Sequence, residues 1–252
     1  EDRLQEWLRL AEENKETLQI GRTHGQHAEP ITFGLVMAYY CSRLNERLNQ
    51  LIKSSSSLVG KMSGAVGAYN ASNIFFSDPD EFEKEVLAEL GLKPGPVSTQ
   101  IVAPEYMTDY VHSLISLFGI LADFSDDMRH LQRTEIGEVG EYFASDQVGS
   151  STMPHKRNPI NYENVKSMWK EFMPRMITSY EDQLSEHQRD LTNSASSRFV
   201  PEIAVALLAS CDRLLRVSKK MHIDKESMID NFNKHKEMII AEPLYIILAS
   251  KG

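Results

Sequence analysis

The sequence predicts an all-α protein built around a bundle of long helices, and three observations point to this fold class. Along residues 104–133, apolar residues recur at alternating steps of four and three, which is the seam pattern of packed helices. Apolar residues at helical spacing mark further long segments, and no segment gives a convincing sheet. The composition, 41% hydrophobic and 25% charged over 252 residues, is that of an ordinary globular protein.

The longest predicted helix runs from about Pro104 to Arg133 and would be roughly 45 Å long at the rise of an α-helix. A second apolar face, which includes Val111 and Ile115, requires several packing neighbours. Long helices with two apolar faces favour assembly between chains, so we expect an oligomer. The seam consists of Ala103, Met107, Tyr110, Leu114, Leu117, Leu121, Phe124, Met128 and Leu131.

The remaining helices follow from spacing and end signals. Asp78, followed three residues later by Glu81, is expected to cap one of the shorter helices. The start of the chain has the pattern of the middle of an amphipathic helix, so we expect its natural N-terminus to be missing. Long helices are predicted at about 31–54, 160–183 and 195–219, shorter helices at 79–90 and 225–235, and at most a short extended pair at 59–69.

Charge and cysteine usage restrict the partners. A net charge of −9, from 36 acidic and 27 basic residues, argues against nucleic acid but leaves room for a small anionic ligand. No apolar run reaches the roughly 18 residues of a membrane span. Cys41 and Cys211 lie in apolar helical stretches and are expected to be buried free thiols in a reducing cytosol. No Cys/His cluster has zinc spacing, so no metal site is predicted.

Three polar segments between the helices, 21–30, 137–159 and 185–198, carry most of the reactive residue types. The second of them precedes the helix predicted at 160, whose free N–H groups could bind a carboxylate. From these residues alone, an ordinary polar loop is an equal alternative. The glycines of 60–67 indicate a tight backbone approach instead of a nucleotide-binding loop, because the strand–loop–helix context is missing.

The segment 149–159 reads Gly-Ser-Ser-Thr-Met-Pro-His-Lys-Arg-Asn-Pro. It matches the signature of the fumarase/aspartase superfamily, Gly-Ser-Ser-x-Met-Pro-x-Lys-x-Asn-Pro, at every fixed position. The resemblance extends from about residue 20 to residue 248 and implies an all-α long-helix bundle that forms a multi-helix core in a homotetramer with shared active sites. Segments that resemble adenylosuccinate lyases in particular are 21–30, 98–101, 188–194 with Arg198, and 240–243.

The resemblance implies elimination of fumarate from adenylosuccinate, and from the analogous succinylated aminoimidazole carboxamide ribotide, in purine synthesis. His24 would be the acid that protonates the leaving nitrogen, a role that suits histidine because its pKa lies near the working pH. Ser150 is the expected base, with Ser151 as the alternative. Lys156 and Asn158 would stabilise the negative charge of the carbanion intermediate.

The resemblance also implies substrate contacts. Arg189 and Arg198, with Ser194 between them, would form a phosphate cradle, because the forked donors of arginine match phosphate oxygens. Glu163 is a candidate for orienting a catalytic histidine, and a solvated carboxylate at a helix start is the equal alternative. No cofactor is implied, because protein groups can supply the acid, the base and the anion stabilisation. The other expected substrate contacts are Thr23, Gln100, Met153 and Asn164.

By this resemblance, residues 1–218 form the central long-helix bundle domain and residues 219–252 begin a small helical C-terminal domain. The first domain of the family and the end of its third would then be absent. One alternative is another superfamily member, such as argininosuccinate lyase, aspartase, fumarase or carboxymuconate cycloisomerase, whose substrates carry no phosphate. The other is a non-catalytic structural bundle. The phosphate cradle opposes the first, and the joint presence of His24, Ser150, Lys156 and Asn158 opposes the second.

Overall fold

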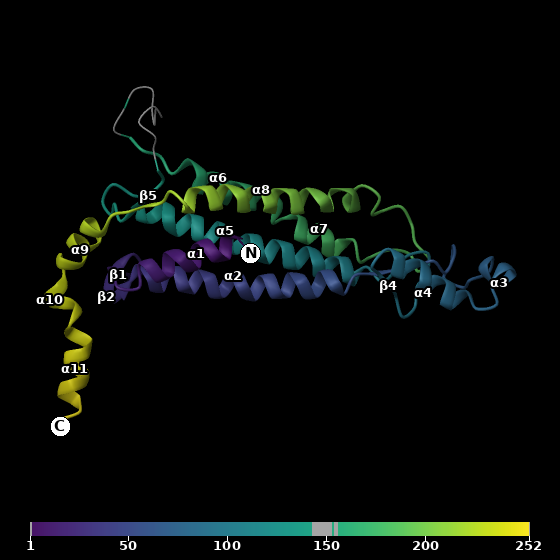
Figure 1. The fold of residues 1–252 in the computed structure, drawn as a ribbon, viewed down its shortest axis with the longest axis horizontal. Coiled ribbons are helices and arrows are strands. Elements are labelled where there is room, and N and C mark those ends of the chain that lie inside the picture. Colours follow the sequence, from purple (N-terminus) through teal and green to yellow (C-terminus); the bar gives the residue numbers. More distant parts are fainter. Residues whose placement is uncertain (1, 143–152, 154–155, 252) are drawn as a thin grey trace. The chain divides into compact units, whose positions relative to one another are not determined.

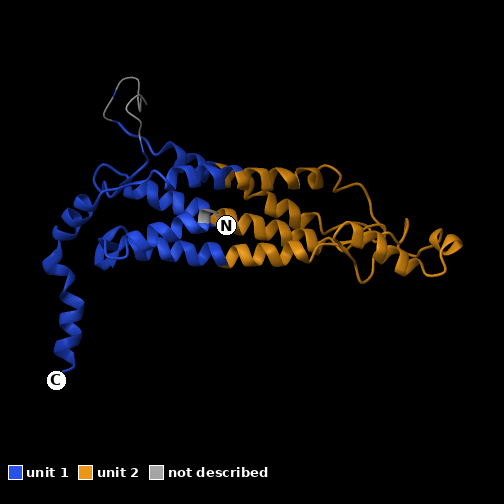
Figure 2. Ribbon diagram, in the orientation of Figure 1, with its two compact units in different colours: residues 1–45, 120–167, 209–252 blue, residues 46–119, 168–208 orange. Residues whose placement is uncertain are grey.

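A computed structural model describes residues 2–142, 153 and 156–251, and these residues are predominantly helical (Figure 1). They divide into two compact units (Figure 2). Unit 1 comprises residues 1–45, 120–167 and 209–252, and unit 2 comprises residues 46–119 and 168–208. The predicted all-α class is confirmed, whereas the domain boundary at residue 218 stays a prediction.

Helices account for most of the described residues, and the strands between them are short. The helices are α1 (Asp2–Glu13), α2 (Phe33–Ser56), α3 (Ser72–Phe75), α4 (Pro79–Glu89), α5 (Glu105–Leu131), α6 (Ile160–Phe172), α7 (Arg175–Glu181), the 3-10 helix η1 (Ser196–Phe199), α8 (Val200–Ser218), α9 (Lys225–Asn233), α10 (Lys236–Ile239) and α11 (Ala241–Ala249). The strands are β1 (Leu18–Thr23), β2 (Gln26–Thr32), β3 (Val59–Gly60), β4 (Lys93–Pro94), β5 (Val139–Gly140) and β6 (His222–Ile223).

The predicted helices are confirmed with one main correction. The long helices α2 and α5 lie within two residues of their predicted bounds, and the side chain of Asp78 accepts the N–H of Glu81 at 3.0 Å, as expected of a cap. The single helix predicted at 160–183 is wrong: α6 ends at Phe172 and α7 begins at Arg175. Pro174 lies at the break, where its missing N–H interrupts the helical hydrogen-bond ladder.

Unit 1 is built around an aromatic cluster centred on Phe124 of α5, which is fully buried. Its ring lies 4.2 Å from that of Trp7 in α1 and 5.3 Å from that of Tyr40 in α2, the latter edge to face. Tyr162 of α6 approaches at 6.3 Å. The indole N–H of Trp7 donates to the hydroxyl of Ser218 in α8 at 3.0 Å. Four helices therefore meet at these rings, and the hydrogen bond of the Trp7 indole connects α8 to the same cluster.

An antiparallel hairpin, β1–β2, is the main element that the sequence did not predict. Its strands lack strict alternation of apolar and polar residues, and Pro30 lies inside β2, which argues against a strand from sequence alone. The register shifts at Gly21, where a Cβ atom would lie 2.9 Å from the carbonyl oxygen of Glu29. His24 and Gly25 form the two-residue turn with φ of 54° and 76°, as in a type I′ turn. At 59–69, where the sequence allows at most a short extended pair, the structure has only the two-residue strand β3, which pairs with β4 and not within this segment.

In unit 2, the hydroxyl of Thr108 in α5 donates to the carbonyl oxygen of Ser179 in α7 at 3.1 Å. The tight approach expected from the glycines of 60–67 is confirmed at Gly67, which has a φ of +75°. A Cβ atom there would lie 2.0 Å from the carbonyl oxygen of Ser98, so the loop fits only glycine. The hydroxyls of Ser63 and Ser98 lie 2.6 Å apart and join the same two loops.

Neither cysteine is in a disulfide bond, as predicted. Cys41 is buried, and burial raises the pKa of its thiol to about 11, whereas Cys211 is only half-buried. Among the described helices, none is long and apolar enough to cross a membrane.

The approach of α1 to α2 gives a test of the packing in unit 1. A Cβ atom on Gly34 would lie 2.5 Å from the carbonyl oxygen of Ala11 and 2.6 Å from backbone atoms of Lys15. Backbone atoms have little freedom to move, so we expect Gly34→Ala to lower the free energy of unfolding by about 1–3 kcal/mol. Urea denaturation followed by circular dichroism measures this change.

Gly119→Ala is the matched control, because Gly119 is also helical and a Cβ there would meet only the ring of Trp169 at 3.5 Å. We expect this variant to be neutral or up to about 1 kcal/mol more stable, since alanine favours the helix. Equal stability of the two variants would contradict the close packing of α1 and α2.

Candidate active site

The His24 turn is the exposed tip of the β1–β2 hairpin in unit 1. Thr23 and His24 are both exposed, and the positive φ of His24 is a conformation that few side chains adopt. Beyond the register shift, the tip contains only the cross-strand pairs Arg22–His27 and Thr23–Gln26. The exposed imidazole therefore depends on this short tip for its position.

A buried acid, Glu138, accepts hydrogen bonds from two side chains of β1. The Arg22 guanidinium donates to its two oxygens, at 2.5 Å through Nη2 and at 3.1 Å through Nη1. Gln19 donates through Nε2 at 2.7 Å, and Asn231 of α9 donates through Nδ2 at 2.8 Å. Glu138 is not predictable as a site residue from the sequence, because an acid in a polar segment is usually solvated, whereas this one is 0% exposed.

The start of α6 is closed by a second buried acid, Glu141, which is 6% exposed. Its Oε1 accepts the backbone N–H groups of Asn161 at 2.8 Å and of Tyr162 at 2.9 Å, and its Oε2 accepts the side-chain amide of Asn161 at 2.5 Å. The N–H of Ile160 donates to Asn158, and that of Glu163 to Pro159. The expectation of free N–H groups for a ligand carboxylate is therefore wrong, because the protein satisfies these donors itself.

The described signature residues lie immediately before α6. Lys156 is exposed, Asn158 is half-buried, and the N–H of Lys156 donates to the carbonyl oxygen of Met153 at 3.0 Å. Glu163 and Asn164 are exposed in the first turns of α6. Unit 1 thus carries seven of the expected site residues: Thr23, His24, Met153, Lys156, Asn158, Glu163 and Asn164. Two further expected residues, Ser150 and Ser151, lie outside the described residues.

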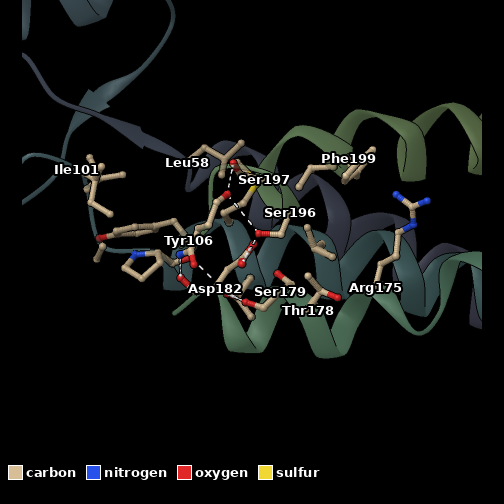
Figure 3. Close-up of a pocket in the computed structure, with 18 of the residues that line it drawn as sticks. Leu58, Ile101, Tyr106, Arg175, Thr178, Ser179, Asp182, Ser196, Ser197 and Phe199 are labelled. Atoms are coloured by element: carbon tan, nitrogen blue, oxygen red, sulfur yellow. Dashed lines mark hydrogen bonds between the residues drawn. The ribbon is translucent and has the colours of Figure 1, made fainter. Parts of the chain in front are cut away.

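Unit 2 carries the expected phosphate-binding residues, and one of them lines a pocket of about 570 Å³ in this unit (Figure 3). Arg189 lines this pocket, whose apolar walls come mainly from residues 101–104, α5 and α8, whereas α7 contributes polar residues. Arg198 is exposed in η1, and Ser194 is half-buried in the preceding turn. Asp182 also lines the pocket and accepts the hydroxyl of Ser196 at 2.5 Å, so a negative charge is already present there. Arg175 also lines the pocket but pairs with Glu202 at 3.0 Å, so a phosphate there would need these arginines to outweigh the charge of Asp182.

Gln100 lies exposed in the loop before α5, in unit 2. Its carbonyl oxygen accepts the ammonium group of Lys61 at 3.2 Å, and the same ammonium also binds the carbonyl oxygen of Gly64. This contact fixes the backbone of Gln100 and leaves its amide side chain exposed. Because the contact with Lys61 uses the backbone carbonyl of Gln100, the side-chain amide can form a hydrogen bond to a ligand.

A second pocket, of about 470 Å³, lies against the hairpin in unit 1. Gln19, Arg22 and Gly25 line it from β1 and the turn. Asp127 and His130 line it from α5, so its wall carries groups of both charge signs. This pocket brings together residues that the sequence analysis did not connect.

Comparison with known proteins places this geometry in a family. Residues 3–173, more than half of the chain, match the profile of a protein family described as lyase. The chain therefore belongs to this lyase family. The chain is similar to adenylosuccinate lyases. It is 39% identical to the enzyme of Aquifex aeolicus over 99% of this chain, and 40% identical to that of Pyrococcus abyssi over 96% of this chain. It is 37% identical to that of Bacillus subtilis over 96%.

The chain spans about half the length of the curated relatives it matches, between 54% and 56% of each. Among solved structures, it is similar to the 3-carboxy-cis,cis-muconate lactonizing enzyme from Pseudomonas putida, with a TM-score of 0.87 and 25% identity over all of this chain and 56% of that one. A fumarate lyase from Mesorhizobium sp. BNC1 shares the fold, with a TM-score of 0.84 and 21% identity over 99% and 55%.

The role of Glu141 as the cap of α6, the helix that follows the signature segment, can be tested by mutation. In Glu141→Ala, the N–H groups of Asn161 and Tyr162 lose their acceptor. We expect a loss of about 1–3 kcal/mol in the free energy of unfolding, because unsatisfied buried donors are costly. Hydrogen exchange at these two amides should also become faster.

Glu171→Ala is the control, since Glu171 is exposed in the last turn of α6, and we expect a change within about 0.5 kcal/mol. Unchanged exchange at Asn161 and Tyr162 in Glu141→Ala would show that Glu141 does not cap α6.

Proposed function

We propose that this chain is part of an adenylosuccinate lyase, which eliminates fumarate from adenylosuccinate to give AMP. The observation that carries the proposal is the identity of 37–40% to such enzymes over at least 96% of the chain. The complete signature segment 149–159 adds to it. The same elimination from the succinylated aminoimidazole carboxamide ribotide is included in the proposal.

In the proposed reaction, a base removes a proton from the carbon next to the one that bears the leaving nitrogen, and an acid protonates that nitrogen. His24 is the proposed acid. Its exposure on the hairpin turn leaves the imidazole accessible to a substrate. Ser150 is the proposed base, with Ser151 as the alternative. Glu163 is proposed to orient a catalytic histidine, and its exposure leaves the carboxylate available for that contact.

The carbanion intermediate carries extra negative charge, which must be stabilised where it develops. Lys156 and Asn158 are proposed for this role. Because Glu141 already binds the first backbone amides of α6, the N-terminus of this helix offers few hydrogen-bond donors to a ligand. The ammonium of Lys156 and the amide of Asn158 therefore take most of this task. Lys156 is exposed, as a group that meets a ligand should be.

The nucleotide phosphate is proposed to bind Arg189, Ser194 and Arg198. Arg189 lines the pocket of unit 2, and its forked donors suit phosphate oxygens. The side chains proposed for the remaining substrate contacts are Thr23, Gln100, Met153 and Asn164. We further propose a homotetramer with shared active sites, no cofactor and a cytosolic location.

The proposal predicts that the complete protein containing this chain converts adenylosuccinate, which ultraviolet absorbance follows directly. Argininosuccinate, aspartate, malate and 3-carboxy-cis,cis-muconate should give no turnover. In Arg189→Ala, we expect KM to rise by about tenfold or more, because a charge-assisted hydrogen bond contributes about 1.5–3 kcal/mol. The effect on kcat should be smaller, since the phosphate lies away from the reacting bond.

Arg47→Ala is the matched control, since Arg47 lies in the same unit on α2 and pairs only weakly with Glu46 at 3.5 Å. Its KM should equal that of the unaltered protein. Turnover of a phosphate-free substrate instead would preserve the lyase family and reject the specific proposal. A folded protein that converts none of these substrates would favour the non-catalytic bundle.

A further inference from the structure

We infer that Glu138 is a positioning residue of the active site, which holds the His24 turn through Arg22. The inference rests on the proposed function, in which His24 is the acid. Glu138 lies just after α5 and just before β5, far along the chain from the hairpin that it binds.

The first observation is the complete hydrogen bonding of the buried Glu138 carboxylate. Glu138 has no exposed surface, and a buried charge is stable only when it is paired and fully hydrogen-bonded. Arg22 and Asn231 donate to Oε1, while Gln19 and Arg22 donate to Oε2. Each oxygen therefore has two donors, which fills the acceptor capacity of a carboxylate. Movement of Arg22 would leave a buried charge without its counterion.

The second observation is the change of register within the hairpin. The register shift at Gly21 separates the tip from the rest of the sheet, and a bulge of this kind redirects the strand beyond it. Arg22 is the first tip residue, and His24 follows two residues later in a left-handed conformation. The side chain of Arg22 is only 14% exposed, whereas Thr23, His24 and Gly25 are exposed. The Arg22–Glu138 pair is thus a buried attachment for an otherwise exposed turn.

A third observation concerns the cross-strand partner of Arg22. His27 pairs with Arg22 in the register, and its Nδ1 lies 3.0 Å from Nδ1 of His235 before α10. Burial, followed by the charge of Arg22, lowers the pKa of His27 and favours a neutral ring. A neutral ring can share one proton with His235 as a hydrogen bond. Both residues of the first tip pair are therefore attached to other segments of unit 1.

The same carboxylate offers a matched control. Asn231 donates to Glu138 and, at 2.7 Å, to the carbonyl oxygen of Ile136, so its side-chain amide attaches α9 to the carboxylate without a hydrogen bond to the hairpin. A general structural role of Glu138 predicts that loss of Asn231 and loss of the carboxylate act alike. A positioning role predicts that only loss of the carboxylate, or of the Arg22 fork, affects the reaction.

The experiment compares Glu138→Gln, Arg22→Lys and Asn231→Ala in the complete protein, with adenylosuccinate as substrate. In Glu138→Gln, we expect kcat per folded molecule to fall at least tenfold, with KM changed less than threefold. Arg22→Lys keeps the positive charge but loses the forked pair of donors, so its kcat should lie between those of the unaltered protein and Glu138→Gln. Asn231→Ala should retain kcat within twofold. Hydrogen exchange of residues 22–27 should quicken in Glu138→Gln and not in Asn231→Ala.

Two outcomes would overturn the inference: a kcat within twofold of the unaltered protein in Glu138→Gln, or equal losses in Glu138→Gln and Asn231→Ala. If the unaltered protein converts none of the tested substrates, the proposed function fails by itself. Hydrogen exchange then decides whether Glu138 holds the turn. Unchanged exchange at residues 22–27 in Glu138→Gln would reject that attachment, and faster exchange would establish it.

Discussion

The Glu138 carboxylate is fully buried, and a charge in that environment requires a donor at every acceptor position. Those donors come from β1 and from α9, so the hairpin and α9 must both meet the segment that follows α5. Three residues later, Glu141 imposes a similar requirement on the first turn of α6. Residues 138–141 thus join the hairpin that carries His24 to the helix that follows the signature segment. In unit 1, the geometry of the expected catalytic residues depends on these two buried acids.

The proposed site separates reactive groups from the groups that hold them. His24 and Lys156 are exposed, as groups that meet a substrate must be, whereas Glu138 and Glu141 have almost no exposed surface. An exposed side chain reaches a ligand with useful accuracy only when its backbone is fixed by packing and hydrogen bonds. The aromatic cluster around Phe124 provides the packing in unit 1, and the buried acids provide the hydrogen bonds. In unit 2, the contact of Lys61 with the backbone of Gln100 has the same character.

The sequence predicted the long helices because their apolar spacing is repeated over many turns, as in α5 and α2. Asp78 was equally predictable, because a cap acts within one helical turn. The hairpin was missed because Pro30 and the register shift at Gly21 remove the alternating pattern of a strand. Glu138 was missed for a different reason: its partners lie more than 90 residues away in the sequence, and nothing local marks an acid as buried. The family signature pointed to residues proposed as reactive but not to the residue proposed to position His24.

We propose that the buried carboxylate of Glu138 holds His24 against the leaving nitrogen of the substrate. A crystal structure of the complete protein with AMP and fumarate bound tests it most directly. We expect a ring nitrogen of His24 within about 3 Å of the exocyclic nitrogen of AMP, with the Arg22 guanidinium still bound to Glu138. Bound products with His24 out of hydrogen-bond reach, or with Arg22 separated from Glu138, would contradict it.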